Sequence, residues 1–208
     1  MPVRRPSTGL EQVLPTPDQV DAAVGNRLDP TGPAVVGSIS LLPNGIRDSH
    51  DITPLDCLGP ATPLMRVVFE KGDVRGVALR DFARFGAGVA VSNVHTGAVR
   101  FASDAEANRL FAAFVSQWRS CNGSAVTVHL TPTASLQWTV TDVRAVGGIL
   151  SATILSAETS GRQAFPTEHA VGVAADCIVD VDVAVTGRAE TGTRAVDLVQ
   201  LMLANTNP

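Results

Sequence analysis

The chain has 208 residues, of which 45% are hydrophobic and 17% charged, and its formal net charge at pH 7 is -4. This length suits one domain, and this composition is typical of a folded core and argues against an intrinsically disordered protein. No run of basic residues follows Arg4 and Arg5, so the chain carries no electrostatic footprint for nucleic acid, and we expect no nucleic-acid partner.

The N-terminal residues contain prolines and show no periodicity. We therefore expect a flexible arm over residues 1–15, followed by a single domain over residues 16–208. No stretch approaches the roughly 20 apolar residues that a membrane-spanning helix needs, and the first residues lack the apolar segment of a signal peptide. The chain as given is expected to be soluble.

Thr16 and Pro17 predict the start of a short helix over residues 18–24, which Gly25 ends. Residues 26–50 are rich in proline and glycine and predict loops with at most one strand, over residues 34–42. Alternating or continuous apolar patterns then predict strands, which short links should join as antiparallel neighbours. These predicted strands cover residues 65–70, 76–83, 88–93, 125–130, 137–143, 149–157 and 170–186.

A helix is predicted from Ser103 to Cys121. Ser103 and Glu106 have the spacing of a capping box, in which the serine accepts a first-turn N–H and the glutamate reaches back to the cap N–H. Apolar side chains at three- and four-residue spacing form one stripe that should cover a sheet. Trp118 lies on this stripe, so we expect it in the core. A second helix, capped by Thr193, should also pack on the sheet.

The strand over residues 170–186 carries valines and Cys177 at odd positions and aspartates at even ones. We interpret one face as core and the other as solvent-exposed. Cys177 then faces the core, as does Cys121 at the helix end, and a disulfide between them requires no change to either element. Cys57 would be unpaired. Spacing alone leaves a second possibility open, three buried thiols in a cytosolic protein.

The elements together predict an α+β fold, an antiparallel sheet of about six or seven strands with helices packed around it and a cleft. Nucleotide-binding and zinc-binding spacings are lacking in the sequence, so no cofactor or metal is expected. Ser49, His50 and Asp51 are consecutive and cannot converge as a catalytic triad. Asp180 and Asp182 lack the oxygen-rich loop of a calcium site and are interpreted as a solvated face.

Candidate ligand-binding residues follow from the neighbourhood of Trp138. A large aromatic side chain among polar neighbours on a strand is typical of a ligand surface, because it offers contact area with few rotatable bonds. The predicted ligand-binding set consists of Trp138, Thr139, Thr141, His129 and His50. No catalytic residue is predicted.

Several segments resemble a known family: residues 10–25 (LEQVLPTPDQVDAAVG), 56–59 (DCLG), the helix end at residues 118–121 (WRSC) and residues 175–177 (ADC). They are similar to the PknH-type extracellular sensor domain of mycobacterial serine/threonine kinases and related envelope lipoproteins. The resemblance spans roughly residues 10–203. It implies an antiparallel sheet with helices around a ligand cleft, no catalysis, and an exported domain.

The resemblance therefore predicts an extracytoplasmic, non-catalytic ligand-binding module, the soluble part of a lipoprotein whose membrane anchor is absent from this chain. Its partner would be a small molecule or an envelope lipid or glycan, with another envelope protein as a further possibility. Two other classes stay open, an envelope hydrolase and a structural interaction module. A hydrolase would show a nucleophile in contact with a base, and an interaction module a flat apolar patch.

Overall fold

The computed structural model describes residues 9–131, 134–158, 165–186 and 190–206. Within these ranges lies one antiparallel sheet of ten strands in the order β1-β4-β5-β10-β9-β8-β7-β6-β3, with β2 also pairing with β4. The fold class is as predicted, with more strands than expected. The strands are β1 (Asp29–Pro30), β2 (Val35–Gly37), β3 (Ile52–Thr53), β4 (Val74–Ala83), β5 (Val91–Phe101), β6 (Ala125–Thr131), β7 (Ala134–Val146), β8 (Ile149–Glu158), β9 (Phe165–Ala174) and β10 (Cys177–Val185).

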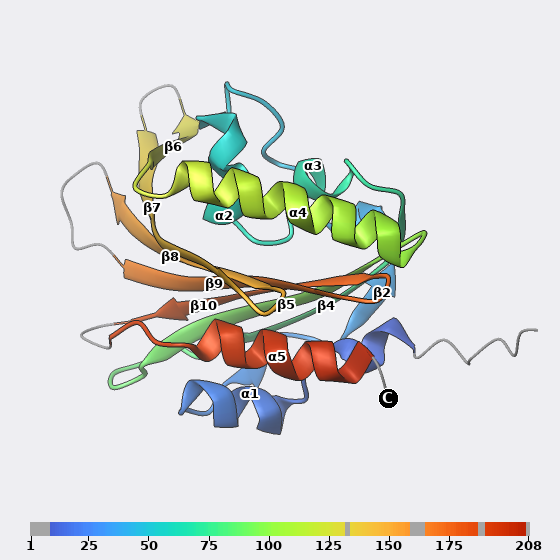
Figure 1. Cartoon of the computed structure of the whole chain (residues 1–208). Helices are drawn as coiled ribbons and strands as arrows, with labels where there is room; N and C mark the ends of the chain where they lie inside the picture. The colour runs from blue at the N-terminus through green and yellow to red at the C-terminus, as the bar shows by residue number, and fades with distance from the viewer. Residues whose placement is uncertain (1–8, 132–133, 159–164, 187–189, 207–208) are drawn as a thin grey trace, which may run out of the picture.

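Helices cover both faces of the sheet (Figure 1). α4 (Asp104–Cys121) lies over one face together with the short α2 (Leu58–Ala61) and α3 (Arg66–Phe69), and α5 (Arg194–Thr206) lies over the other with α1 (Pro17–Val24). Three 3-10 turns complete the described elements: η1 (Leu10–Val13), η2 (Ile39–Leu41) and η3 (Leu55–Cys57). The molecule is therefore a three-layer arrangement with two separate cores, which we call the α4-side core and the α5-side core.

The predicted strand over residues 170–186 is in fact a hairpin. β9 and β10 pair through Ala174 and Cys177, and the turn between them uses Ala175 at φ +50°. Because the turn reverses the chain, odd positions of β10 face the α5-side core, whereas Val171 of β9 packs in the α4-side core. The valines alternate without interruption in the sequence, but those of β9 and those of β10 face opposite sides of the sheet. The side predicted to face water is covered by helices.

This change of face explains why the predicted disulfide is wrong. Cys121 lies in the α4-side core and Cys177 in the α5-side core, so the sheet separates them. Cys121 instead forms a disulfide with Cys57, with the two Cα atoms 5.7 Å apart. Cys177 is a buried free thiol, and burial raises its pKa to about 12.

The predicted arm is too long at its C-terminal end. Leu10 and Val13 of η1, followed by Leu14, are buried in the α5-side core, so residues 10–14 belong to the folded domain. Residues 1–8 lie outside the described residues. The helix after the arm is as predicted: Thr16 caps α1 with a full capping box, and Gly25 ends it at φ +76°.

The predicted strand over residues 65–70 is wrong. Most of this segment forms α3, in which Val68 and Phe69 are buried. The ring of Phe69 meets Phe114 of α4 edge to face, with the ring centroids 5.6 Å apart. Contact with α4 favours a helical turn that presents both residues to one side, and it outweighs the strand preference of the consecutive valines.

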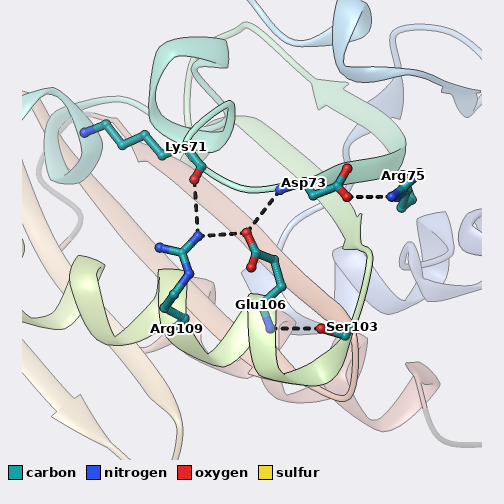
Figure 2. Close-up of polar contacts among 6 residues, drawn as sticks. All are labelled: Lys71, Asp73, Arg75, Ser103, Glu106 and Arg109. Atoms are coloured by element: carbon teal, nitrogen blue, oxygen red, sulfur yellow. Dashed lines mark hydrogen bonds and ion pairs between the residues drawn. The ribbon is translucent and has the colours of Figure 1, made fainter.

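Figure 2 shows the polar network that fixes the start of α4. Ser103 Oγ accepts the N–H of Glu106, as predicted, at 3.2 Å. The Glu106 carboxylate instead accepts the N–H of Asp73 at 3.2 Å and a guanidinium N–H of Arg109 at 2.7 Å. Arg109 also donates to the carbonyl oxygen of Lys71. Half of the predicted capping box therefore forms, and the other half ties α4 to the turn before β4.

Candidate functional site

A cleft of about 290 Å³ opens between the start of α5 and the strands β7, β8 and β9. Its surface is divided about equally between polar and apolar atoms, and hydroxyl groups come from both the sheet and the segment that leads into α5. The lining residues are Asp142, Arg144, Ser151, Ala152, Thr153, Glu168, His169, Thr191, Gly192, Thr193, Ala195 and Val196. The cleft is concave and brings charged side chains together with hydroxyl groups.

A β-bulge in β7 sets the direction of the charged residues in this cleft. Thr141 pairs with Thr153 and Arg144 with Ser151, so two residues of β7 stand opposite one of β8. Asp142 adopts φ +52° in the bulge, and the N–H of Val143 donates to Asn122 Oδ1 at 3.2 Å. A bulge of this kind changes which residues face each side of a sheet.

The bulge turns Arg144 away from the hydrophobic core. Before it, Trp138 and Val140 at even positions pack against the α4-side core, and after it Val143 and Ala145 at odd positions do so. Arg144 consequently lines the cleft on the α5 face instead of the core. Within the described ranges, neither Arg144 nor Asp142 takes part in an ion pair, and both side chains are exposed.

Glu168 at the bottom of the cleft already has its partners. Its carboxylate accepts the N–H of Gly192 at 2.7 Å and that of Ala195 at 3.3 Å, and it forms an ion pair with Arg194. A carboxylate at this place satisfies free N–H groups of the first helical turn and interacts favourably with the helix dipole. Glu168 therefore anchors the start of α5, and Arg144 is an exposed cation of the cleft lining.

A second group of ionisable residues lies on the α4 side of the sheet. His95 Nδ1 lies 3.0 Å from Asp81 Oδ1, and the backbone N–H of His95 donates to Asp182 Oδ1. Burial raises the pKa of Asp182 to about 6. Burial alone would lower the pKa of His95, but Asp81 and Asp182 outweigh it and the pKa is raised.

Beside this group, His169 and Asp180 form a buried pair whose side chains are 1% and 3% exposed. His169 Nε2 lies 2.8 Å from Asp180 Oδ1, and Nδ1 lies 2.8 Å from the carbonyl oxygen of Pro60. A carbonyl can only accept, so Nδ1 carries a proton, and neither nitrogen is free to take one from a nucleophile. Burial alone would lower the pKa of His169, but the interaction with Asp180 outweighs burial, so the pKa of His169 is raised. The pair is buried in the core, and Asp180 favours the protonated form of the imidazole.

The structure does not bring the five predicted ligand-binding residues together. Trp138 is half-buried and packs against the α4-side core, whereas Thr139 and Thr141 lie on the opposite face of β7. Thr141 is next to the cleft and donates to the carbonyl oxygen of Thr153. His50 and His129 are exposed near the β3–β6 edge, away from the cleft. Ligand binding by these five residues stays a prediction.

Sequence reasoning missed Arg144 and Asp142, although a signal was present. The apolar positions of β7 are even up to Val140, whereas Val143 and Ala145 are odd, and this change of phase marks a bulge. Trp118, by contrast, is correctly predicted: it is 1% exposed and its ring lies against His169, with the ring centroids 4.6 Å apart.

Comparison with known proteins decides the family. The family model described as the PknH-like extracellular domain matches residues 6–205. The chain belongs to this family. No curated protein matches the sequence. Among the described residues, no helix is long and apolar enough to cross a bilayer, and no group of three or more His, Cys, Asp or Glu side chains is arranged to hold a metal ion.

Solved structures agree with the family. The crystal structure of the extracellular domain of PknH from Mycobacterium tuberculosis superposes with a TM-score of 0.80 at 17% identity, over 98% of this chain and 97% of that one. An uncharacterised protein from Mycobacterium smegmatis gives a TM-score of 0.50 at 14% identity, over 98% and 99%. At these identities the likeness concerns the fold, and this PknH-like domain shares it.

Proposed function

We propose that this PknH-like domain is a non-catalytic, extracytoplasmic sensor-type module that binds a small ligand in the cleft beside α5. The observation that carries the proposal is the β7 bulge, which turns Arg144 out of the core and into a cleft lined by hydroxyl groups. In its full-length form the protein would be membrane-anchored in the cell envelope, as a lipoprotein.

The lining favours a small molecule with an anionic group. A guanidinium binds a carboxylate or a phosphate through two parallel hydrogen bonds, and Arg144 has no competing ion-pair partner among the described residues. The hydroxyls of Ser151 and Thr153 can bind further polar groups of the same ligand, and that of Thr193, which donates to Asp197, can still accept a hydrogen bond. Asp142 would accept hydrogen bonds from ligand hydroxyl or amino groups.

The environment of the buried reactive groups supports a role without catalysis. His169 has both ring nitrogens engaged, and burial keeps the Cys177 thiol protonated. A general base needs a nitrogen that faces its proton donor, and a nucleophilic cysteine needs a lowered pKa. An envelope hydrolase is therefore the weaker alternative.

The test is an NMR titration of the ¹⁵N-labelled domain with inorganic phosphate, a sugar phosphate and the matched uncharged sugar. We expect the sugar phosphate to shift amide resonances of β7, β8 and the α5 start, and Arg144→Ala to abolish these shifts. Arg119→Ala, which removes an exposed arginine from the last turn of α4 on the other face, is the control. Shifts that persist in Arg144→Ala, or that appear equally with the uncharged sugar, would contradict the proposal.

A further inference from the structure

Four ionisable side chains form a row across four neighbouring strands. Asp81 of β4 is the Cα partner of His95 of β5, His95 is the partner of Asp182 of β10, and Asp182 is the partner of His169 of β9. Paired residues of adjacent strands project to the same face, so acid and base alternate along one line on the α4 side of the sheet. Asp180, which contacts His169, extends the row into the core.

The two ends of the row differ in their access to solvent. The side chains of Asp81 and His95 are 45% and 40% exposed, whereas those of His169 and Asp180 are almost fully buried. Asp182 lies between the two histidines and interacts electrostatically with both. The charge state at the exposed end therefore affects the buried end through Asp182, because charges interact strongly where solvent screens them little.

The buried end holds a segment that we call the strap, residues 57–64. His169 Nδ1 donates to the carbonyl oxygen of Pro60, and the N–H of Leu64 donates to Asp180 Oδ2 at 2.9 Å. The Leu64 side chain fills the space above Gly97, where an added Cβ would come within 2.4 Å of Leu64 Cδ2. At its other end Cys57 is bonded covalently to α4. The His169–Asp180 pair thus makes polar contacts with the strap at Pro60 and at Leu64, close to the point where the chain enters α3.

We propose that the row is a proton-responsive device that holds the strap on the sheet while its histidines are protonated and loosens it when they lose their protons. With both histidines charged, the row alternates in sign from Asp81 to Asp180, and each charge has an opposite neighbour. Loss of the two protons leaves the carboxylates of Asp81, Asp182 and Asp180 beside one another, with Asp180 buried and unpaired. A buried carboxylate without a counter-ion is strongly unfavourable.

Within the described part of the chain, the charged side chains that raise the pKa values of the two histidines are carboxylates of the row. The groups that raise the pKa of His95 are Asp81, Asp182 and Asp180, from β4 and β10. Those that act on His169 are Asp180, Asp182 and the carbonyl of Pro60. The response therefore belongs to the row itself, and substitution at its centre should alter it.

The experiment follows the amide of Leu64, because this N–H is the donor that the strap gives to Asp180. Hydrogen exchange is measured by NMR between about pH 6 and about pH 9 and corrected for the intrinsic rise of exchange with pH. We expect the protection factor of Leu64 to fall by at least about tenfold, while amides in the centre of β10 keep theirs. An unchanged protection factor for Leu64 would overturn the proposal.

A second measurement tests the coupling along the row. Asp182→Asn keeps the shape of the side chain and removes its charge, so the pKa values of His95 and His169 should both fall and the loss of Leu64 protection should begin at lower pH. The ring resonances of His50 and His129, which lie outside the row, are internal references, and Asp176→Asn at the β9–β10 turn is the matched control. If Asp182→Asn shifts neither His169 nor the exchange of Leu64, the row does not act as a unit and the proposal fails.

Discussion

A disulfide joins Cys57, at the end of η3, to Cys121, at the end of α4, while Cys177 lies on the far side of the sheet. The disulfide closes a loop of 64 residues in sequence separation, which contains β4, β5 and most of α4. In the chain-entropy model, a loop of this size stabilises the fold by about 4 kcal/mol. It also fixes one end of the strap, so any movement of residues 58–64 takes place about a covalent anchor.

The first prediction concerns the cysteines. Intact-mass measurement after alkylation without reductant should show one reactive thiol in the denatured protein, Cys177, and none in the native protein, because this thiol is buried and its pKa is raised to about 12. Peptide mapping should recover the Cys57–Cys121 linked peptides. Three alkylatable thiols in the unreduced protein, or a linked Cys121–Cys177 peptide, would contradict this pairing.

The second prediction concerns the buried ion pair. Asp180→Asn leaves the charged His169 without its counter-ion, and it should lower the free energy of unfolding by about 3–5 kcal/mol at neutral pH. Glu190→Gln, an exposed change of the same kind, should change it by less than about 0.5 kcal/mol. Urea denaturation of both variants measures the difference. A loss below about 1 kcal/mol for Asp180→Asn would show that the pair is not ionised in the core.

The third prediction compares the two tryptophans. Trp118→Ala should leave a cavity beside His169 and cost about 3–5 kcal/mol, since its side chain is fully buried. Trp138 is half-buried at the margin of the same core, so Trp138→Ala should cost less. Thermal melting of both variants measures the order. Equal losses would mean that Trp138 is a full core residue and not part of a ligand surface.

The sequence identifies the helices better than the sheet, and the reason is physical. The starts of α1 and α4 depend on local capping groups, and the apolar stripes of the helices depend on a single period, so Thr16 and Ser103 can be interpreted without knowledge of the rest. The start of α5 is held by Glu168 of β9, which the sequence around Thr193 does not reveal. Which face of a strand is buried depends on turns and bulges. These features shift the alternation of buried and exposed residues without a strong local signal in the sequence. Ala175 at positive φ is an example, because alanine gives no hint of the turn between β9 and β10.

The candidate site was harder to predict for the same reason. Arg144 lines the cleft because Asn122, in the α4–β6 link, holds the bulge open through the N–H of Val143. The histidine row likewise requires the register of four strands, and His95 and His169 are far apart in sequence. The periodicity of one strand shows which of its residues share a face, but not which residues of other strands lie beside them, because this depends on long-range strand pairing.

A fourth prediction concerns catalysis. A panel of esterase, phosphatase and peptidase substrates should show no turnover that depends on His50 or His129, the two exposed histidines. The test uses His50→Ala and His129→Ala beside the unchanged protein. Turnover that either substitution abolishes would replace the sensor assignment with an envelope hydrolase, whereas weak turnover insensitive to both changes would leave the assignment intact.

The last prediction is the pH dependence of stability. Asp182 has a pKa of about 6 in the folded state against an ordinary value of 3.8, so between about pH 4 and pH 6 the folded state binds more protons than the unfolded one, and stability falls as pH rises through this window. His95 and His169 have raised pKa values in the folded state. Their contribution is complete below about pH 6.5 and is lost as pH rises through the folded values.

These contributions have the same sign, and together they predict a melting temperature that is highest at acidic pH, at about pH 4, and decreases toward about pH 9. Glu106 acts in the opposite direction. Its hydrogen bond to Arg109 lowers the pKa of Glu106 in the folded state, so its contribution to stability is lost as the pH falls and the carboxylate is protonated. Calorimetric melting across this range measures the profile. Asp182→Asn removes the carboxyl group that titrates in the acidic window, so the fall between about pH 4 and pH 6 should flatten in this variant. A melting temperature that rises steadily toward about pH 8 in the unchanged protein would show that the row does not bind protons as its geometry indicates.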